Sequence, residues 1–126
     1  MADRLQNAMD LKGLCGLAGG EVAAIVKVLP AEVAGKAADC TVSYEDKPDD
    51  GEGLEEGILG LFEGASLIEE AGPDAMPRIR IFVSNLWEYT EGDEQDFLDE
   101  VGTTYLHELG HYLGWDEDEI AARGLE

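Results

Sequence analysis

The strongest constraint on the fold is an amphipathic pattern that runs from Phe97 to Leu113. Large apolar residues recur there at the three- and four-residue spacing of an α-helix. They are Phe97, Leu98, Val101, Tyr105, Leu106, Leu109, Tyr112 and Leu113. The opposite stripe consists of Glu100, Thr104, His107, His111 and Gly114. The pattern predicts one long helix that buries one face on a core and presents the other face to a cleft.

Both histidines of the chain lie on the second stripe, in the run His107-Glu108-Leu109-Gly110-His111. Residues four apart project from the same face of a helix about one turn apart, so their two imidazole nitrogens can bind one metal ion. Glu108 lies beside them and need not bind the ion itself, which is where a general base for a water must be. We therefore expect His107 and His111 to be metal ligands and Glu108 to be a catalytic base.

A glycine and an acidic run follow the second histidine. Gly114 stands three residues after His111, where a glycine in the left-handed region can end the helix and turn the chain back beneath the metal. Asp116, Glu117 and Asp118 come next. A structural zinc site takes four protein ligands, whereas a catalytic site takes three and leaves one position for water. A carboxylate after the turn would complete the catalytic set.

The run HELGHYLGWDEDE resembles the H-E-x-x-H-x-x-G-x-x-H/D motif of the metzincins. The chain looks closest to the small bacterial zincin-like metallopeptidase family, and the likeness covers residues 21–122. It implies a single α+β domain over residues 1–126, with a small mixed β-sheet packed on the long metal-binding helix and an edge strand near residues 58–62 bordering the substrate cleft. It also implies Zn²⁺ as the cofactor and a peptide or unfolded protein as the substrate.

The third metal ligand is the point where the chain departs from the family pattern. The family usually has aspartate three residues after the turn glycine, whereas this chain has Glu117. We expect Glu117 to be the third ligand on the basis of its position. Asp116 is the alternative, because the longer glutamate side chain changes the fit of the same turn.

The end of the chain offers little further catalytic apparatus. The nine residues after Glu117 contain no methionine for a metzincin methionine turn, and we expect no second helix there that supplies a glutamate ligand. Arg123 is the one candidate there for stabilising an oxyanion. Tyr105 and Tyr112 fall on the back of the predicted helix, so we expect them in the core. The resemblance therefore implies a modest or narrowly specific activity.

Glu100 lies two helical turns before His107 on the same stripe, and two interpretations of it remain open. One is a hydrogen-bond acceptor that supports the metal site from behind, and the other is an ordinary solvated glutamate. The second interpretation is the simpler one.

Composition limits the class of partner. The chain has 29 acidic and 8 basic residues and a formal net charge of -21, which disfavours nucleic acid as a partner. The excess acid predicts either a solvated, repulsive surface or a cleft that prefers basic peptides, and charge runs usually mark solvated faces. No apolar run is long enough for a secretory signal or a membrane span, so we expect a cytoplasmic protein that does not bind membranes. Nothing specifies an oligomeric state.

Local signals outline the rest of the fold. They predict helices near residues 3–12, 20–29 and 31–38 with glycine breaks between residues 13 and 20, and strands at 40–45, 58–62 and 79–83. Cys15 and Cys40 stand far apart without a C-x-x-C pair, so we expect two buried or half-buried thiols outside the metal site.

Three functions are compatible with these features. The leading hypothesis is a zinc-dependent peptidase with Glu108 as the general base. The alternative is a catalytically weak or inactive module that binds metal or peptides on the same fold. The third is an acidic interaction domain in which the histidine motif is accidental.

Overall fold

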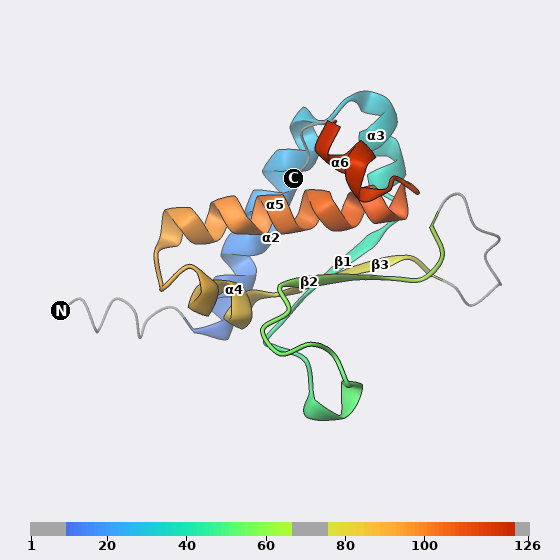
Figure 1. Cartoon of the computed structure of the whole chain (residues 1–126). Helices are drawn as coiled ribbons and strands as arrows, with labels where there is room; N and C mark the ends of the chain where they lie inside the picture. Colours follow the sequence, from blue (N-terminus) through green and yellow to red (C-terminus); the bar gives the residue numbers. More distant parts are fainter. Residues whose placement is uncertain (1–9, 67–75, 123–126) are drawn as a thin grey trace.

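The computed structural model describes residues 10–66 and 76–122, with the backbone alone at residues 117, 120 and 121. In this part of the chain, three strands form a mixed sheet in the order β1-β3-β2 (Figure 1). The strands are β1 (Thr41–Glu45), β2 (Gly60–Glu63) and β3 (Arg78–Phe82). The central strand β3 runs parallel to β1 and antiparallel to β2. Strand β2 is therefore an edge of the sheet.

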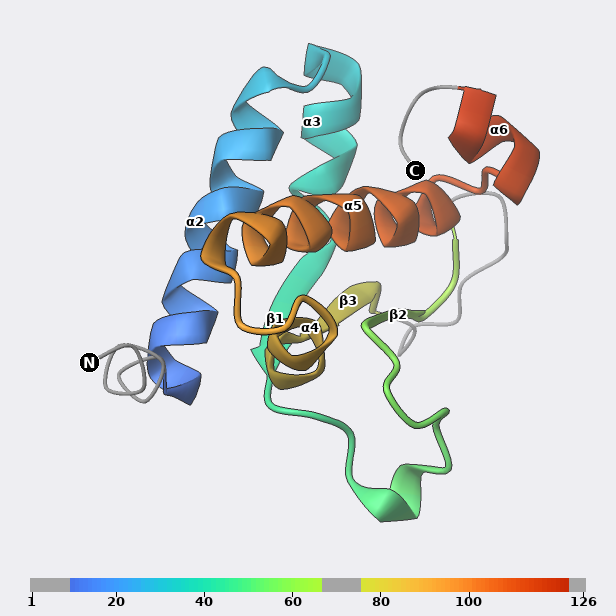
Figure 2. The same cartoon turned by 60° about the vertical axis from the view of Figure 1, so that its left-hand side comes forward.

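Helices cover one face of this sheet, as the two cartoon views show (Figures 1 and 2). The helices α2 (Leu11–Val28) and α5 (Glu94–Tyr112) pack against each other, α2 contacts β1, and α5 contacts β2 and β3. Ile79 and Ile81 of the central strand point into this core and are fully buried. The chain thus folds as the expected α+β structure, with a small mixed sheet packed on the long helix.

Helix α5 is the long helix predicted from the amphipathic pattern. Phe97, Val101, Tyr105 and Leu109 recur every four residues along it, and all four are buried. Full burial of a side chain of this size contributes about 1.5–3 kcal/mol. At the start of the helix, the side chain of Asp93 accepts a hydrogen bond from the amide of Asp96, which caps the first turn. Tertiary packing and local capping therefore favour the same helix.

The glycine breaks expected between residues 13 and 20 are absent, and that prediction was wrong. Helix α2 runs without interruption through Gly13, Gly16, Gly19 and Gly20. Each glycine in a helix interior costs roughly 0.5–1 kcal/mol relative to alanine. Leu14, Ala18 and Val22 form a buried stripe along the helix, and their packing outweighs that cost. The helix expected at residues 3–12 lies mostly outside the described residues, whereas α3 (Ala31–Ala37) forms close to its expected place.

Alanine in place of two of the α2 glycines should stabilise the fold. A Cβ added at Gly16 or Gly20 would meet no atom within 4 Å. We therefore expect Gly16→Ala and Gly20→Ala each to raise the free energy of unfolding by roughly 0.5–1 kcal/mol. Urea denaturation midpoints measure the effect. Gly102→Ala in α5 is the matched control, because its Cβ would lie 3.0 Å from Cδ1 of Ile25, and it should gain less. Lower midpoints for both α2 variants would contradict the account.

The segment after β3 also differs from expectation. Strand β3 ends at Phe82, and Val83 begins a short helix, α4 (Val83–Tyr89), that was not predicted. No side chain caps the start of this helix, so local sequence offered no helix-start signal. Buried Val83 and Leu86 hold it against the core. Strand β2 forms two residues later than expected, at Gly60–Glu63.

The outer face of the sheet carries one buried arginine among carboxylates. The Arg80 guanidinium donates hydrogen bonds to Glu45 at 2.8 and 3.0 Å, to Glu52 at 2.7 and 3.1 Å and to Glu63 at 3.1 Å. Hydrogen bonds from Arg80 lower the pKa of Glu45 and Glu52, and one from Arg78 lowers that of Glu63. Glu52 belongs to the short 3₁₀ turn η1 (Asp50–Glu52). The cluster therefore ties the loop before β2 to all three strands.

Cys15 and Cys40 are free thiols, half-buried and buried respectively, as expected. Burial raises the pKa of Cys40 to about 11, which keeps this thiol protonated at neutral pH. Among the described residues, no helix has both the length and the apolar character needed to cross a membrane.

Candidate metal centre

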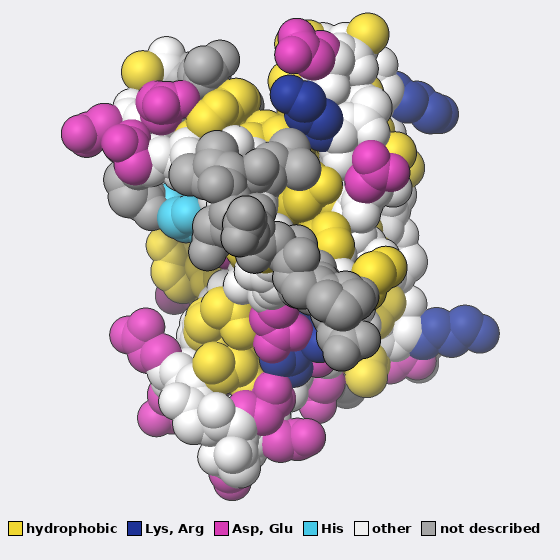
Figure 3. All heavy atoms as spheres, turned by 90° about the vertical axis from the view of Figure 1, so that its right-hand side faces the viewer, with side chains coloured by type: hydrophobic (Ala, Val, Ile, Leu, Met, Phe, Trp, Pro, Cys, Tyr) yellow, Lys and Arg dark blue, Asp and Glu magenta, His cyan; other side chains and the backbone are white. Residues whose placement is uncertain are grey.

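The centre consists of three side chains from one stretch of α5. His107, Glu108 and His111 each offer one ligand atom, and these atoms lie within 4.8 Å of one another. The two histidine rings are nearly perpendicular, at 79°, and their Nε2 atoms are 3.2 Å apart. All three residues are half-buried. In the space-filling view, a histidine reaches the surface beside hydrophobic side chains (Figure 3).

The two histidine nitrogens fit a zinc ion. Zinc binds imidazole nitrogen at about 2.0–2.1 Å, so two nitrogens of a tetrahedral site lie about 3.3 Å apart. The Nε2 atoms of His107 and His111 are separated by 3.2 Å. The helix therefore already holds both rings at the spacing that one ion requires.

The end of α5 turns the chain next to the histidines. Gly114 has a φ of 83°, in the left-handed region that favours glycine. The amide of Gly114 donates to the carbonyl of His111, and the amide of Trp115 donates to that of Gly110, both at 3.0 Å. This pair of bonds is a Schellman motif. The role expected for Gly114 as the residue that ends the helix is thus confirmed.

The acidic run follows this turn, where α6 (Glu117–Ala122) begins. The Oδ1 of Asp116 accepts a hydrogen bond of 2.8 Å from the amide of Glu119, and Asp116 lines a hollow together with His111. Asp118 is exposed. Glu117 is the first residue of α6, and its side chain lies outside the described residues. Glu117 as the third ligand, with Asp116 as the alternative, therefore stays a prediction.

Zinc affinity distinguishes these two carboxylates. We expect Glu117→Ala to weaken zinc binding more than Asp116→Asn or Asp118→Ala, because Glu117 holds the third-ligand position of the motif. Asparagine at position 116 can still cap α6, so this variant changes the carboxylate without removing the cap. Competition with a chromogenic chelator measures the affinities. If Asp116→Asn proves the most damaging change, the turn brings Asp116 to the metal instead.

Two hollows flank Glu108. The first, about 280 Å³, is lined by Leu59 and Gly60 together with His107 and Glu108. The second, about 560 Å³, also includes Glu108, and its other walls include Leu61, Phe62 and Trp115. Glu108 therefore lies between them, and β2 with its flanking residues runs along both. The expectation that this edge strand borders the site is thus met in the geometry.

Gly60 is a site residue that sequence analysis did not single out. A Cβ at this position would lie 2.5 Å from Cγ2 of Thr104 and 3.6 Å from Cγ of Glu108. The missing side chain lets β2 approach α5 at Thr104 and Glu108. A glycine inside an apolar strand pattern often marks such a close backbone approach, so the run Ile58–Phe62 did contain the signal.

The other polar residues that sequence analysis considered for the site are Tyr105, Tyr112, Arg123 and Glu100. Tyr105 and Tyr112 are buried in the core, as predicted. Burial raises the pKa of Tyr105 to about 12 and also raises that of Tyr112, so both phenols stay protonated at neutral pH. Arg123 lies outside the described residues. Glu100 is half-buried and lines the first hollow.

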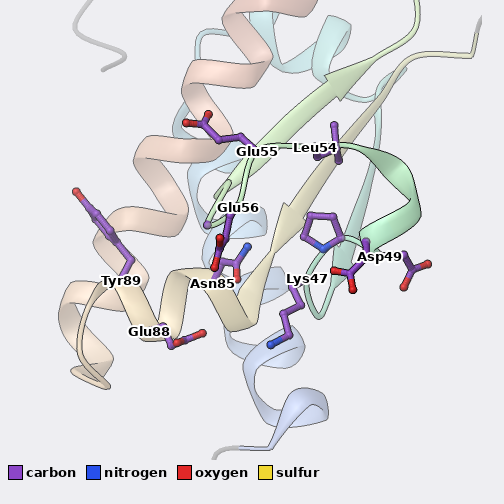
Figure 4. A pocket seen from close by; sticks show the side chains of 11 residues that line it. Lys47, Asp49, Leu54, Glu55, Glu56, Asn85, Glu88 and Tyr89 are labelled. Carbon is purple, nitrogen blue, oxygen red and sulfur yellow. The ribbon is translucent and has the colours of Figure 1, made fainter.

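A third hollow, of about 710 Å³, is larger than the two beside Glu108. Its walls are the loop around Lys47 and Asp49, the segment from Leu54 to Gly57, and α4 at Asn85 and Tyr89 (Figure 4). It contains none of the three residues of the metal centre. The size of a hollow alone therefore does not locate the candidate metal centre.

Comparison with known proteins agrees with the geometry. A family model described as zincin-like metallopeptidase matches residues 37–125, from the last residue of α3 to beyond α6. The match includes the sheet, the histidine pair and the turn at Gly114, while α2 lies outside it. A comparison with curated protein sequences gave no match. The family model covers most of the chain, which therefore belongs to the zincin-like metallopeptidase family.

Proposed function

We propose that the protein is a zinc-dependent peptidase that cleaves peptides or unfolded protein segments. The observation that carries the proposal is the placement of Glu108 beside two histidines with Nε2 atoms 3.2 Å apart, between two hollows along an edge strand. His107, His111 and a carboxylate after Gly114 would hold the ion. Bound Zn²⁺ would supply a Lewis acid that polarises the scissile carbonyl and brings the pKa of a water near neutrality.

Glu108 would perform the proton transfers. Its carboxylate takes a proton from the attacking water as the water oxygen bonds to the carbonyl carbon. The same carboxyl group then gives the proton to the nitrogen of the leaving amine as the C–N bond breaks. Proton transfer of this kind contributes roughly 10²- to 10⁴-fold to the rate.

The edge strand would position the substrate. One side of β2 has no strand partner among the described residues, because β2 is the last strand of the sheet. An extended peptide can add to such an edge through main-chain hydrogen bonds. A peptide aligned on β2 would pass Glu108 with its side chains in the two hollows.

The alternative is a module on the same fold that binds metal or peptides with little or no turnover. One observation favours it, because neither hollow is lined by a lysine or arginine, and Tyr105 and Tyr112 are buried. The described residues therefore offer few side chains to stabilise an oxyanion.

A digest with and without metal tests the proposal. The full chain is stripped with a chelator, reloaded with Zn²⁺, and incubated with a library of unstructured peptides read by mass spectrometry. We expect new cleavage products with the zinc-loaded chain and none with the stripped chain. Cleavage that does not depend on zinc would indicate a contaminating protease. No cleavage across a broad library, with zinc bound, would favour the binding module.

A further inference from the structure

The first hollow beside the base has a chemistry of its own. It is lined by Leu59 and Gly60 on one side and by Glu100, Thr103 and Thr104 of α5 on the other, and it opens next to His107 and Glu108. The two walls thus combine one aliphatic side chain, two threonines and one carboxylate away from the metal centre. A ligand group in this hollow would meet apolar surface first and a negative charge at Glu100.

The carboxylate of Glu100 has no polar partner among the described residues. In the described part of the chain, its carboxylate takes part in no hydrogen bond or ion pair, including any with the two histidines. The hydrogen bond to a metal-binding histidine that sequence analysis left open is therefore not formed. Glu100 is also half-buried in the hollow, so it differs from a fully solvated glutamate.

The position of Glu100 sets the reach that a ligand needs. Seven residues separate Glu100 from His107, which corresponds to roughly 10 Å along a helix axis. In the proposed peptidase, a peptide residue next to the scissile bond would lie at Glu108, so only a long side chain could extend from there to Glu100. Lysine and arginine have this form, with an aliphatic stem that packs on apolar walls and a charged end that binds a carboxylate.

The charge around Glu100 also favours a lysine or arginine side chain as the ligand. No lysine or arginine lines either hollow, so no cation of the lining neutralises Glu100. The net charge of -21 also attracts cationic ligands at long range. We propose that Glu100 is a specificity-determining residue and that preferred substrates carry lysine or arginine at a fixed position on one side of the scissile bond. This inference rests on the proposed peptidase function.

Matched peptides test the role of Glu100. Each peptide pair differs at one residue, lysine against norleucine, which keeps the aliphatic stem and removes the charge. With zinc-loaded wild type, we expect kcat/KM to favour the lysine peptide at one position. In Glu100→Gln, this preference should fall roughly tenfold to a hundredfold, as expected for loss of a hydrogen bond between charged groups. Glu100→Lys should reverse it in favour of a glutamate peptide.

Asp99→Asn is the control, because Asp99 is the exposed neighbour on the same helix and the substitution changes the charge equally. It should leave the lysine preference unchanged. The zinc content of each variant is measured in parallel. A lysine preference in wild type that persists in Glu100→Gln, or equal losses for both peptides with weaker zinc binding, would overturn the proposal and leave Glu100 as a support of the metal site.

A binding measurement separates failure of this inference from failure of the peptidase proposal. Fluorescence anisotropy of the same labelled peptides reports affinity without turnover. If wild type cleaves nothing but binds the lysine peptide more tightly than the norleucine peptide, and Glu100→Gln loses the difference, the specificity role stands and catalysis does not. Equal affinities for the two peptides in wild type would reject the role of Glu100.

Discussion

Replacing Glu108 by glutamine is expected to abolish peptide hydrolysis while the fold and the zinc are retained. Glutamine has nearly the same shape as glutamate, but its amide cannot take the proton from the attacking water. We expect turnover to fall by roughly 10²- to 10⁴-fold. Wild type and Glu108→Gln are compared in the same peptide digest, each with its zinc content and its denaturation midpoint measured.

The Glu108 variant is informative only against a matched substitution. Glu94→Gln changes the same residue type on the same helix, at an exposed position in the first turn. We expect it to cleave as wild type does. Equal cleavage by wild type and Glu108→Gln would mean that Glu108 is not the base or that the activity belongs to another protein.

Replacing either histidine by alanine is expected to abolish stoichiometric zinc binding. Each variant would leave only two protein ligands, which hold the ion poorly compared with the three of a catalytic site. The loss in affinity should exceed the 10–100-fold typical for residues that merely support a ligand. Chelator competition measures it for His107→Ala and His111→Ala, with Asp99→Asn as a control that should bind as wild type does. Wild-type affinity in either histidine variant would remove the metal centre from this helix.

Helix α5 could be predicted because several signals agree over one segment. The apolar period, the position of Gly114 and the four-residue spacing of the histidines all indicate the same helix, and each is local in sequence. The face of the helix that carries His107 and His111 follows from that period alone. The two histidines of the candidate centre could therefore be predicted without knowledge of the tertiary structure.

Other elements depend on contacts that local sequence does not contain. Helix α2 passes through four glycines because Leu14, Ala18 and Val22 pack on the core. Helix α4 has no capping side chain and exists through the burial of Val83 and Leu86. In both places the local signals were weak or opposed to the fold, and tertiary packing decided the outcome.

The surroundings of the metal centre could be predicted only in part. Position in the motif placed Glu108 beside the histidines, but the hollows depend on β2, which pairs with β3, a strand that begins 15 residues after β2 ends. That pairing brings Gly60 against Thr104 and opens the first hollow at Glu100. Strand order is non-local, so the neighbours of Glu100 could not be read from its own helix.

The metal content of the wild-type chain tests the central claim most directly. The purified protein is loaded with Zn²⁺, desalted at neutral pH and analysed for metal and protein together. Neutral pH matters because imidazole must be deprotonated to bind the ion. We expect about one zinc per chain. A loaded wild-type chain that retains no stoichiometric zinc would contradict the claim that His107 and His111 form a metal centre.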